Sequence, residues 1–163
     1  MQVPVRLGIL FLCLGFTMQP AKVPDALKPM DEGGFARTLA SNKGKVVLID
    51  FWASWCHGCR LEMPELIKLQ ERLSKNGFVL LTVSMDEPKG VAAAIQFLKE
   101  QHAPAPAYVQ RAKNEDAFIH TVDKEWSGSL PATFLYGRDG RRAASFIGAT
   151  DVAKIEAEVT RLR

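Results

Sequence analysis

Two cysteines three positions apart, Cys56 and Cys59, lie where an apolar run ends and a helix-compatible run begins. The apolar run Val46–Ala53 is interrupted only by Asp50, so it predicts a strand buried on both faces of a sheet that helices cover. A helix that starts at the first cysteine offers free N–H groups and partial positive charge, and both stabilise a thiolate. A thiol with a lowered pKa is a nucleophile at neutral pH. The motif therefore favours redox chemistry, with Cys56 attacking and Cys59 resolving, because the first cysteine of such a turn is the more exposed.

Other uses of this cysteine pair are open. Zinc takes four ligands, but the chain holds no second cysteine pair, and His102 and His120 have no ligand spacing to a partner. A structural disulfide across two intervening residues closes a very small loop and adds little stability. A rival of a different class is a copper-binding or chaperone module that uses Cys56, Cys59 and His57. We expect no resident metal and no cofactor other than the redox-active disulfide.

The N-terminus differs in composition from the rest of the chain. Residues 1–21 contain no Asp or Glu, and Arg6 precedes the apolar run Leu7–Phe16. A basic residue ahead of a short apolar run is typical of a signal peptide, whereas a spanning helix needs about 20 apolar residues. We expect residues 1–21 to be a signal peptide, or a short anchor at 7–18, and the protein to be exported. Removal of the segment would leave only the active cysteine pair, as suits an oxidising compartment.

Length and composition indicate one globular domain. The chain has 163 residues, 47% of them hydrophobic and 24% charged, which is enough for a core without stabilising disulfides. The net charge is +3 without a Lys/Arg cluster, so no nucleic-acid partner is expected. Residues 22–31 contain two prolines and no clear period, and we interpret them as a linker. Residues 32–163 form the expected domain.

Strand and helix patterns alternate through most of this domain, and a hairpin comes last. Helices are expected at 32–42, from 56 to about 75, after Pro88, at 114–122 and at 152–162. Strands are expected at 46–53, 78–85, 107–111, 133–136 and 143–147. Asp139 and Gly140 indicate a two-residue turn between the last two strands. This order predicts an α/β fold with a mixed sheet and helices on both faces.

Four motifs, met in order along the chain, resemble the thioredoxin family. Val46–Cys59 resembles its active-site strand and turn, and Cys59–Pro64 resembles the Cys-Arg-x-Glu-x-Pro continuation of the exported TlpA/ResA branch. Leu130–Phe134 is similar to the cis-proline segment, and Phe146–Gly148 to the glycine after the hairpin. The resemblance covers residues 32–163. It implies a thioredoxin fold and thiol–disulfide oxidoreductase activity on protein substrates.

The resemblance also implies roles for two carboxyl groups. Cys56 would form a mixed disulfide with the partner, and Cys59 would resolve it. Asp50 would help to deprotonate Cys59, and its place on an apolar strand should desolvate it and raise its pKa. Glu62 lies three residues after Cys59 on the same helix face and would share this role. The alternatives are a structural acid at Asp50 and a solvated helix residue at Glu62.

A substrate groove is implied around the cis-proline segment. Pro131 would be cis and packed opposite the cysteines, with the backbone beside it, at Leu130, pairing with an extended substrate. An ordinary proline at the start of a strand is the alternative. Trp55 would form a surface that flanks the site.

Two departures from the family pattern affect the expected chemistry. Gly58 replaces the proline that most members of this branch carry, and Leu130 replaces the usual Thr, Ile or Val. The Gly58 N–H lies in the first helical turn and is expected to donate to the Cys56 sulfur. A protonated His57 would add to this stabilisation of the thiolate. Both effects would make the protein less reducing than relatives with proline at this position.

The branch implies a periplasmic reductant. Such a protein receives electrons from a membrane donor and serves cytochrome c maturation or a similar thiol target, and we expect a monomer. The alternative within redox chemistry is an oxidase that donates its disulfide.

Overall fold

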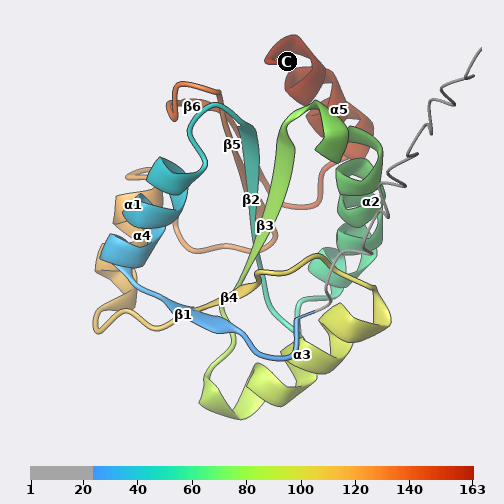
Figure 1. The fold of residues 1–163 in the computed structure, drawn as a ribbon. Helices are drawn as coiled ribbons and strands as arrows, with labels where there is room; N and C mark the ends of the chain where they lie inside the picture. Colours follow the sequence, from blue (N-terminus) through green and yellow to red (C-terminus); the bar gives the residue numbers. More distant parts are fainter. Residues whose placement is uncertain (1–23) are drawn as a thin grey trace, which may run out of the picture.

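The computed structural model describes residues 24–163, which form a single six-stranded sheet with helices on both faces (Figure 1). The strands are β1 (Lys28–Met30), β2 (Val46–Trp52), β3 (Phe78–Ser84), β4 (Tyr108–Gln110), β5 (Ala132–Tyr136) and β6 (Arg142–Ile147). Their order in the sheet is β1-β4-β3-β2-β5-β6. The first four strands pair in parallel, whereas β5 is antiparallel to both β2 and β6. The mixed α/β sheet expected from the sequence is confirmed.

Five helices cover the sheet in the described part of the chain. They are α1 (Glu32–Ser41), α2 (His57–Leu73), α3 (Val91–Glu100), α4 (Glu115–Val122) and α5 (Val152–Arg161). Helices α1 and α4 lie on one face, and α2, α3 and α5 lie on the other (Figure 1). Each face has its own core, because side chains of successive strand residues point to opposite sides.

Strand β2 sits in the middle of the sheet and is buried along its whole length. Its odd-numbered residues from Val47 to Phe51 join the core under α1 and α4. Leu48 and Trp52 join the core under α2. Asp50 lies between these two in sequence, so the alternation directs its side chain to the α2 face as well. The one acidic residue of β2 is thereby placed beneath the helix that carries Cys59.

Helix α2 begins and ends as the sequence predicts. Its N-cap is Cys56, and a short 3₁₀ segment, Ser74–Asn76, extends it to Gly77, whose φ of +79° ends the helical path. Pro64 lies inside the helix. The apolar positions Met63, Leu66, Ile67 and Leu73 are all buried against the sheet.

Two expectations about the ends of the domain were wrong. The stretch 22–31 was expected to be a linker, but β1 occupies Lys28–Met30 and pairs in parallel with β4. Met30 is fully buried, and this apolar anchor together with the backbone ladder holds the segment despite Pro29. The last hairpin also has a longer connection than the two-residue turn expected, because Gly137 N–H donates to the Arg141 carbonyl (2.9 Å) and a bulge follows Leu135.

The expected signal segment at residues 1–21 lies outside the described residues. Over residues 24–163, no helix is both long and apolar enough to span a bilayer.

Candidate active site

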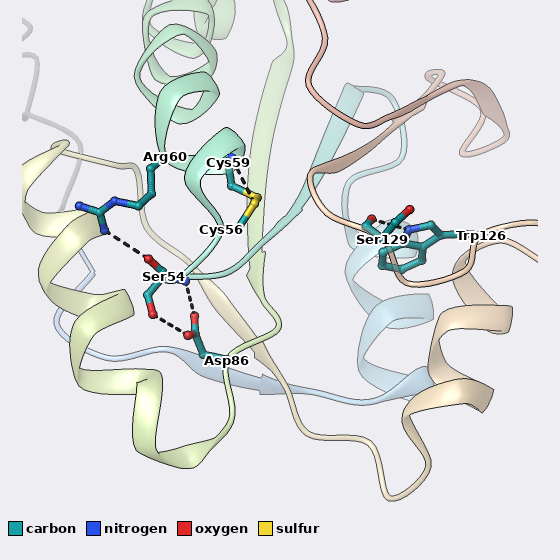
Figure 2. The surroundings of a disulfide bond; sticks show 7 residues. All are labelled: Ser54, Cys56, Cys59, Arg60, Asp86, Trp126 and Ser129. Atoms are coloured by element: carbon teal, nitrogen blue, oxygen red, sulfur yellow. Dashed lines mark hydrogen bonds between the residues drawn. A yellow bond between two sulfur atoms is a disulfide. The ribbon is translucent and has the colours of Figure 1, made fainter.

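Cys56 and Cys59 are joined by a disulfide at the start of α2 (Figure 2). The chain leaves β2, turns at Ser54 and Trp55, and enters the helix at Cys56, whose N–H donates to the Ala53 carbonyl (3.0 Å). Cys56 has extended backbone angles, and its sulfur takes the place of an N-cap oxygen by accepting the Cys59 N–H (3.2 Å). The strand–turn–helix setting predicted for the pair is therefore present.

Both cysteines are buried in the disulfide form, and Cys56 is the less buried of the two. Its exposed fraction is 7%, against 2% for Cys59. This order agrees with the assignment of Cys56 as the attacking residue, although the roles themselves remain predictions. His57, the first residue of α2, is exposed to solvent.

Gly58 does not make the contact expected from the sequence. Among the hydrogen bonds of residues 24–163, the donor to the Cys56 sulfur is the N–H of Cys59, and Gly58 donates nothing to it. An N-cap side chain can accept from the N–H two or three residues ahead, and here the Cys56 sulfur accepts from Cys59, three residues ahead. Gly58 instead approaches Pro131, since a Cβ built on it would lie 3.5 Å from the Pro131 Cδ. The expected contribution of Gly58 to thiolate stability is therefore not supported by this form of the protein.

Asp50 and Glu62 are buried on the α2 side of the sheet. Burial raises the pKa of Asp50 well above its ordinary value, and the nearby Glu62 carboxyl raises it further. Burial alone raises the pKa of Glu62 from 4.5 to about 7. The expected desolvation of Asp50 is confirmed. The alternative of a solvated side chain at Glu62 is wrong, because only 7% of this residue is exposed.

Several buried polar atoms on α2, β2 and β3 have unused hydrogen-bonding capacity. Both carboxyl oxygens of Glu62 are buried without a hydrogen-bond partner among residues 24–163, and so are the Trp52 Nε1 and the Thr82 hydroxyl. Thr82 and Thr133 are the cross-strand neighbours of Asp50, on β3 and β5. Buried polar groups normally have partners, so unpaired ones call for a reason, such as a functional role or a bound water.

The segments expected to form a substrate groove lie around the turn. The Leu130–Pro131 peptide bond is cis, Pro131 is buried, and Leu130 packs partly against both cores. Trp55 is 71% exposed next to Cys56, and its part in a substrate groove stays a prediction. Across the site, the Trp126 indole N–H donates to the Ser129 carbonyl (2.9 Å), which ties down the loop before Leu130 (Figure 2).

An open hollow of about 490 Å³ lies beside the turn, between α2 and the start of α5. Gly58, Leu61 and Glu62 contribute to one wall, and Ala149 and Val152 contribute to the other. Leu61 is 66% exposed, which leaves an apolar rim next to the cysteines.

Sequence reasoning missed a set of polar contacts on the other side of the turn. Asp86, just beyond β3, accepts hydrogen bonds from both the backbone N–H and the hydroxyl of Ser54, and Arg60 donates to the Ser54 carbonyl. One signal was available, because Asp86 is an acidic residue that directly follows a buried strand, near the edge where β2 also ends. Between residues 24 and 163, no group of three or more His, Cys, Asp or Glu side chains is arranged to hold a metal ion.

Comparison with known proteins identifies the fold and the activity. The AhpC/TSA family matches residues 20–142. The thiol:disulfide interchange protein DsbE of Pseudomonas aeruginosa is 30% identical over 151 residues, which cover 86% of this chain and 78% of that protein. The thiol-disulfide oxidoreductase ResA of Bacillus cereus is 27% identical over 161 residues, covering 91% and 88% of the two chains.

A solved structure supports the same fold. The crystal structure of a thioredoxin-family thiol:disulfide interchange protein from Chlorobium tepidum superimposes with a TM-score of 0.64 at 22% identity, over 76% of this chain and 83% of that one. The predicted thioredoxin-like fold is thereby confirmed. With a Cys56–Cys59 disulfide at the start of α2 and relatives of this kind over most of its length, the chain belongs to the AhpC/TSA family of thioredoxin-like proteins and is a thiol–disulfide oxidoreductase.

Proposed function

We propose that this protein is an exported, monomeric reductant of protein disulfides that receives its electrons from a membrane donor. Its target would be a thiol pair in cytochrome c maturation or a similar thiol protein of the periplasm. The Cys56–Cys59 pair would carry the two electrons without any other cofactor. The composition of residues 1–21 supports export, and the two named relatives support exchange between thiols and disulfides.

The reaction has two exchange steps. In the first, the Cys56 thiolate attacks one sulfur of the target disulfide, forms a mixed disulfide and releases one target thiolate, which takes up a proton. In the second, Cys59 loses its proton and attacks the Cys56 sulfur of the mixed disulfide. The second target thiolate leaves, and the Cys56–Cys59 disulfide forms. Two electrons pass from the protein to the target, and a donor must then reduce the new disulfide.

The buried acid pair is the observation that carries this proposal. Cys59 is almost fully buried, so water cannot readily take its proton, and a base is needed nearby. Glu62 lies one turn further along α2, and its pKa of about 7 lets it gain or lose a proton near neutral pH. It also lines the hollow between α2 and α5, which offers the proton a short path to solvent. Asp50 lies beneath the helix and is coupled to Glu62.

The same acids favour the reducing direction. A strongly oxidising protein stabilises its thiolate, because this stabilises the reduced form. Here any negative charge on Asp50 or Glu62, below the cysteines, would disfavour a thiolate. The Arg60 guanidinium contacts the Ser54 carbonyl and the Phe97 ring. Within residues 24–163, the one donor to the Cys56 sulfur is the N–H of Cys59. A thiolate with so little support leaves the disulfide relatively stable, as a reductant requires.

Redox equilibration of the purified protein in glutathione buffers tests this direction. We expect a reduction potential closer to the value of about −270 mV found for thioredoxin than to the value of about −120 mV found for DsbA. A potential near the DsbA value would refute the reductant assignment and favour an oxidase.

Trapping identifies the partner. A Cys59→Ser variant cannot resolve the mixed disulfide, so we expect it to accumulate a covalent complex with an exported thiol protein, which mass spectrometry identifies. Cys56→Ser is the matched control, since it keeps one cysteine but lacks the attacking one. A complex that forms equally with both variants would contradict the proposed order of attack.

A further inference from the structure

The buried carboxylate of Asp86, which has no part in the exchange steps described above, accepts hydrogen bonds from the turn that precedes Cys56. Asp86 is 1% exposed and lies just after β3. One of its oxygens accepts the Ser54 backbone N–H (2.8 Å) and the Ser84 hydroxyl (2.8 Å), and the other accepts the Ser54 hydroxyl (2.6 Å). Figure 2 shows the two bonds to Ser54 side by side, on the opposite side of the turn from the helix. Charge-assisted bonds of this kind are stronger than neutral ones and fix geometry.

The remaining polar group of Ser54 is held as well. Its carbonyl accepts a long hydrogen bond from Arg60 Nη1 (3.4 Å), and the Arg60 guanidinium lies 4.3 Å from the centre of the Phe97 ring. Ser54 is also a corner of the turn that the Cys56 N–H closes on the Ala53 carbonyl. The N–H, hydroxyl and carbonyl of one residue therefore tie the turn to β3 and α2.

Gly90 provides independent evidence that space is kept for this carboxylate. A Cβ at position 90 would lie 2.6 Å from the Asp86 Oδ1, a distance that such atoms do not adopt. The backbone of Gly90 has φ −88° and ψ −13°, which any residue can take. The side chain of Asp86, and not the backbone of Gly90, is thus what excludes a larger residue there.

We propose that Asp86 is a positioning residue for thiol–disulfide exchange. By fixing Ser54, it holds Cys56 at the N-cap of α2, where the sulfur accepts the Cys59 N–H. A loosened turn would let the sulfur leave this position and lose the support of the helix N-terminus. The reactivity of Cys56 would then fall although no group that touches the substrate had changed. The inference concerns the exchange step itself and holds for either direction of electron flow.

Two variants keep the Asp86 carboxylate and disturb only its hydrogen bonds to Ser54. Ser54→Ala removes the hydroxyl bond, and Gly90→Ala pushes the Asp86 carboxylate away from its present place. For both, we expect a higher pKa of the Cys56 thiol, read from thiolate absorbance. The rate constant with a dipyridyl disulfide should be roughly fivefold lower, because a smaller fraction of the thiol is ionised. Ser41→Ala, which removes one hydroxyl bond from α1 on the opposite face, should change neither quantity.

Asp86→Asn separates position from charge. Loss of a nearby negative charge alone would lower the pKa of the Cys56 thiol, whereas loss of positioning raises it. We expect a rise, as in Ser54→Ala. The proposal is overturned if folded Ser54→Ala and Gly90→Ala keep the wild-type pKa and rate constant, even if urea unfolding shows them to be less stable. It is equally overturned if only Asp86→Asn changes the pKa and does so downward. Because the small disulfide needs no natural partner, these outcomes are independent of the proposed direction and target.

Discussion

Replacing Glu62 by Gln should change how the stability of the protein depends on pH. Burial raises the pKa of Glu62 from 4.5 to about 7, so the folded protein binds this proton more tightly than the unfolded chain does. The contribution of such a group to stability is fully present below pH 4.5 and is lost as the pH rises through 7. At 1.36 kcal/mol per pKa unit, the loss amounts to about 3 kcal/mol. Gln fills nearly the same volume and carries no charge at any pH.

The difference between wild type and Glu62→Gln is therefore the quantity to measure. We expect the free energy of unfolding of the wild type to fall by about 3 kcal/mol relative to the variant between pH 4.5 and 8. Part of any larger fall would come from Asp50, because Glu62 contributes to its raised pKa and this effect has the same sign. Urea unfolding of the oxidised protein at several pH values gives both curves. Comparing slopes removes the constant cost of a buried amide.

Glu65→Gln is the matched control on the same helix. Glu65 is exposed and pairs with Lys68 at 2.7 Å, so its removal should cost less than about 1 kcal/mol. If wild type and Glu62→Gln give parallel curves, the Glu62 carboxyl is hydrated in solution, and its assigned part in proton transfer loses its physical basis.

The other predictions concern the exchange reaction. In the reduced protein, Cys56 should be alkylated faster than Cys59, as mass-spectrometric mapping after limited alkylation will show; equal labelling would contradict the assignment of the nucleophile. Asp50→Asn should slow release of the mixed disulfide more than its formation in stopped-flow kinetics, and a defect confined to the first step would remove Asp50 from its role. Gly58→Pro should leave the reduction potential nearly unchanged, because the sulfur takes its hydrogen bond from Cys59; a clearly more negative potential would show that Gly58 supports the thiolate of the reduced form.

The main elements of the fold could be predicted because local signals and burial agree there. β2 is a continuous apolar strand with a single acid, and it is the central strand of the sheet. α2 carries its cap, its apolar face and its terminating glycine within the sequence. β1 could not be predicted in this way, since three residues with a proline have little strand signal. It is a strand because β4, about 80 residues away in the chain, offers it a free edge.

In the candidate site too, local motifs could be predicted from the sequence, whereas contacts between distant segments could not. The Cys-x-x-Cys motif identifies the redox pair, and an acid within an apolar run identifies Asp50. The burial of Glu62 depends on how α2 packs against the sheet and α5, which no local pattern reports. The contacts of Asp86 with Ser54 join residues 32 positions apart, and a Gly90 that leaves room for them looks like an ordinary turn residue in the sequence. The donor to the Cys56 sulfur likewise depended on cap geometry that the residue types alone do not specify.

The central position of β2 has a consequence for how the resolving cysteine is protected. Strands with neighbours on both sides and helices on both faces exchange their amide hydrogens only in the rarest openings, whereas sheet edges such as β6 open far more often. The strand that carries Asp50 should therefore be among the slowest segments in hydrogen exchange, with the α2 face closed over it. Cys56 is the less buried of the two cysteines, so small oxidants should reach its sulfur before that of Cys59. The Cys59 thiol is then preserved for resolving the mixed disulfide. It is not oxidised to sulfinic or sulfonic acid, which thiols cannot reduce.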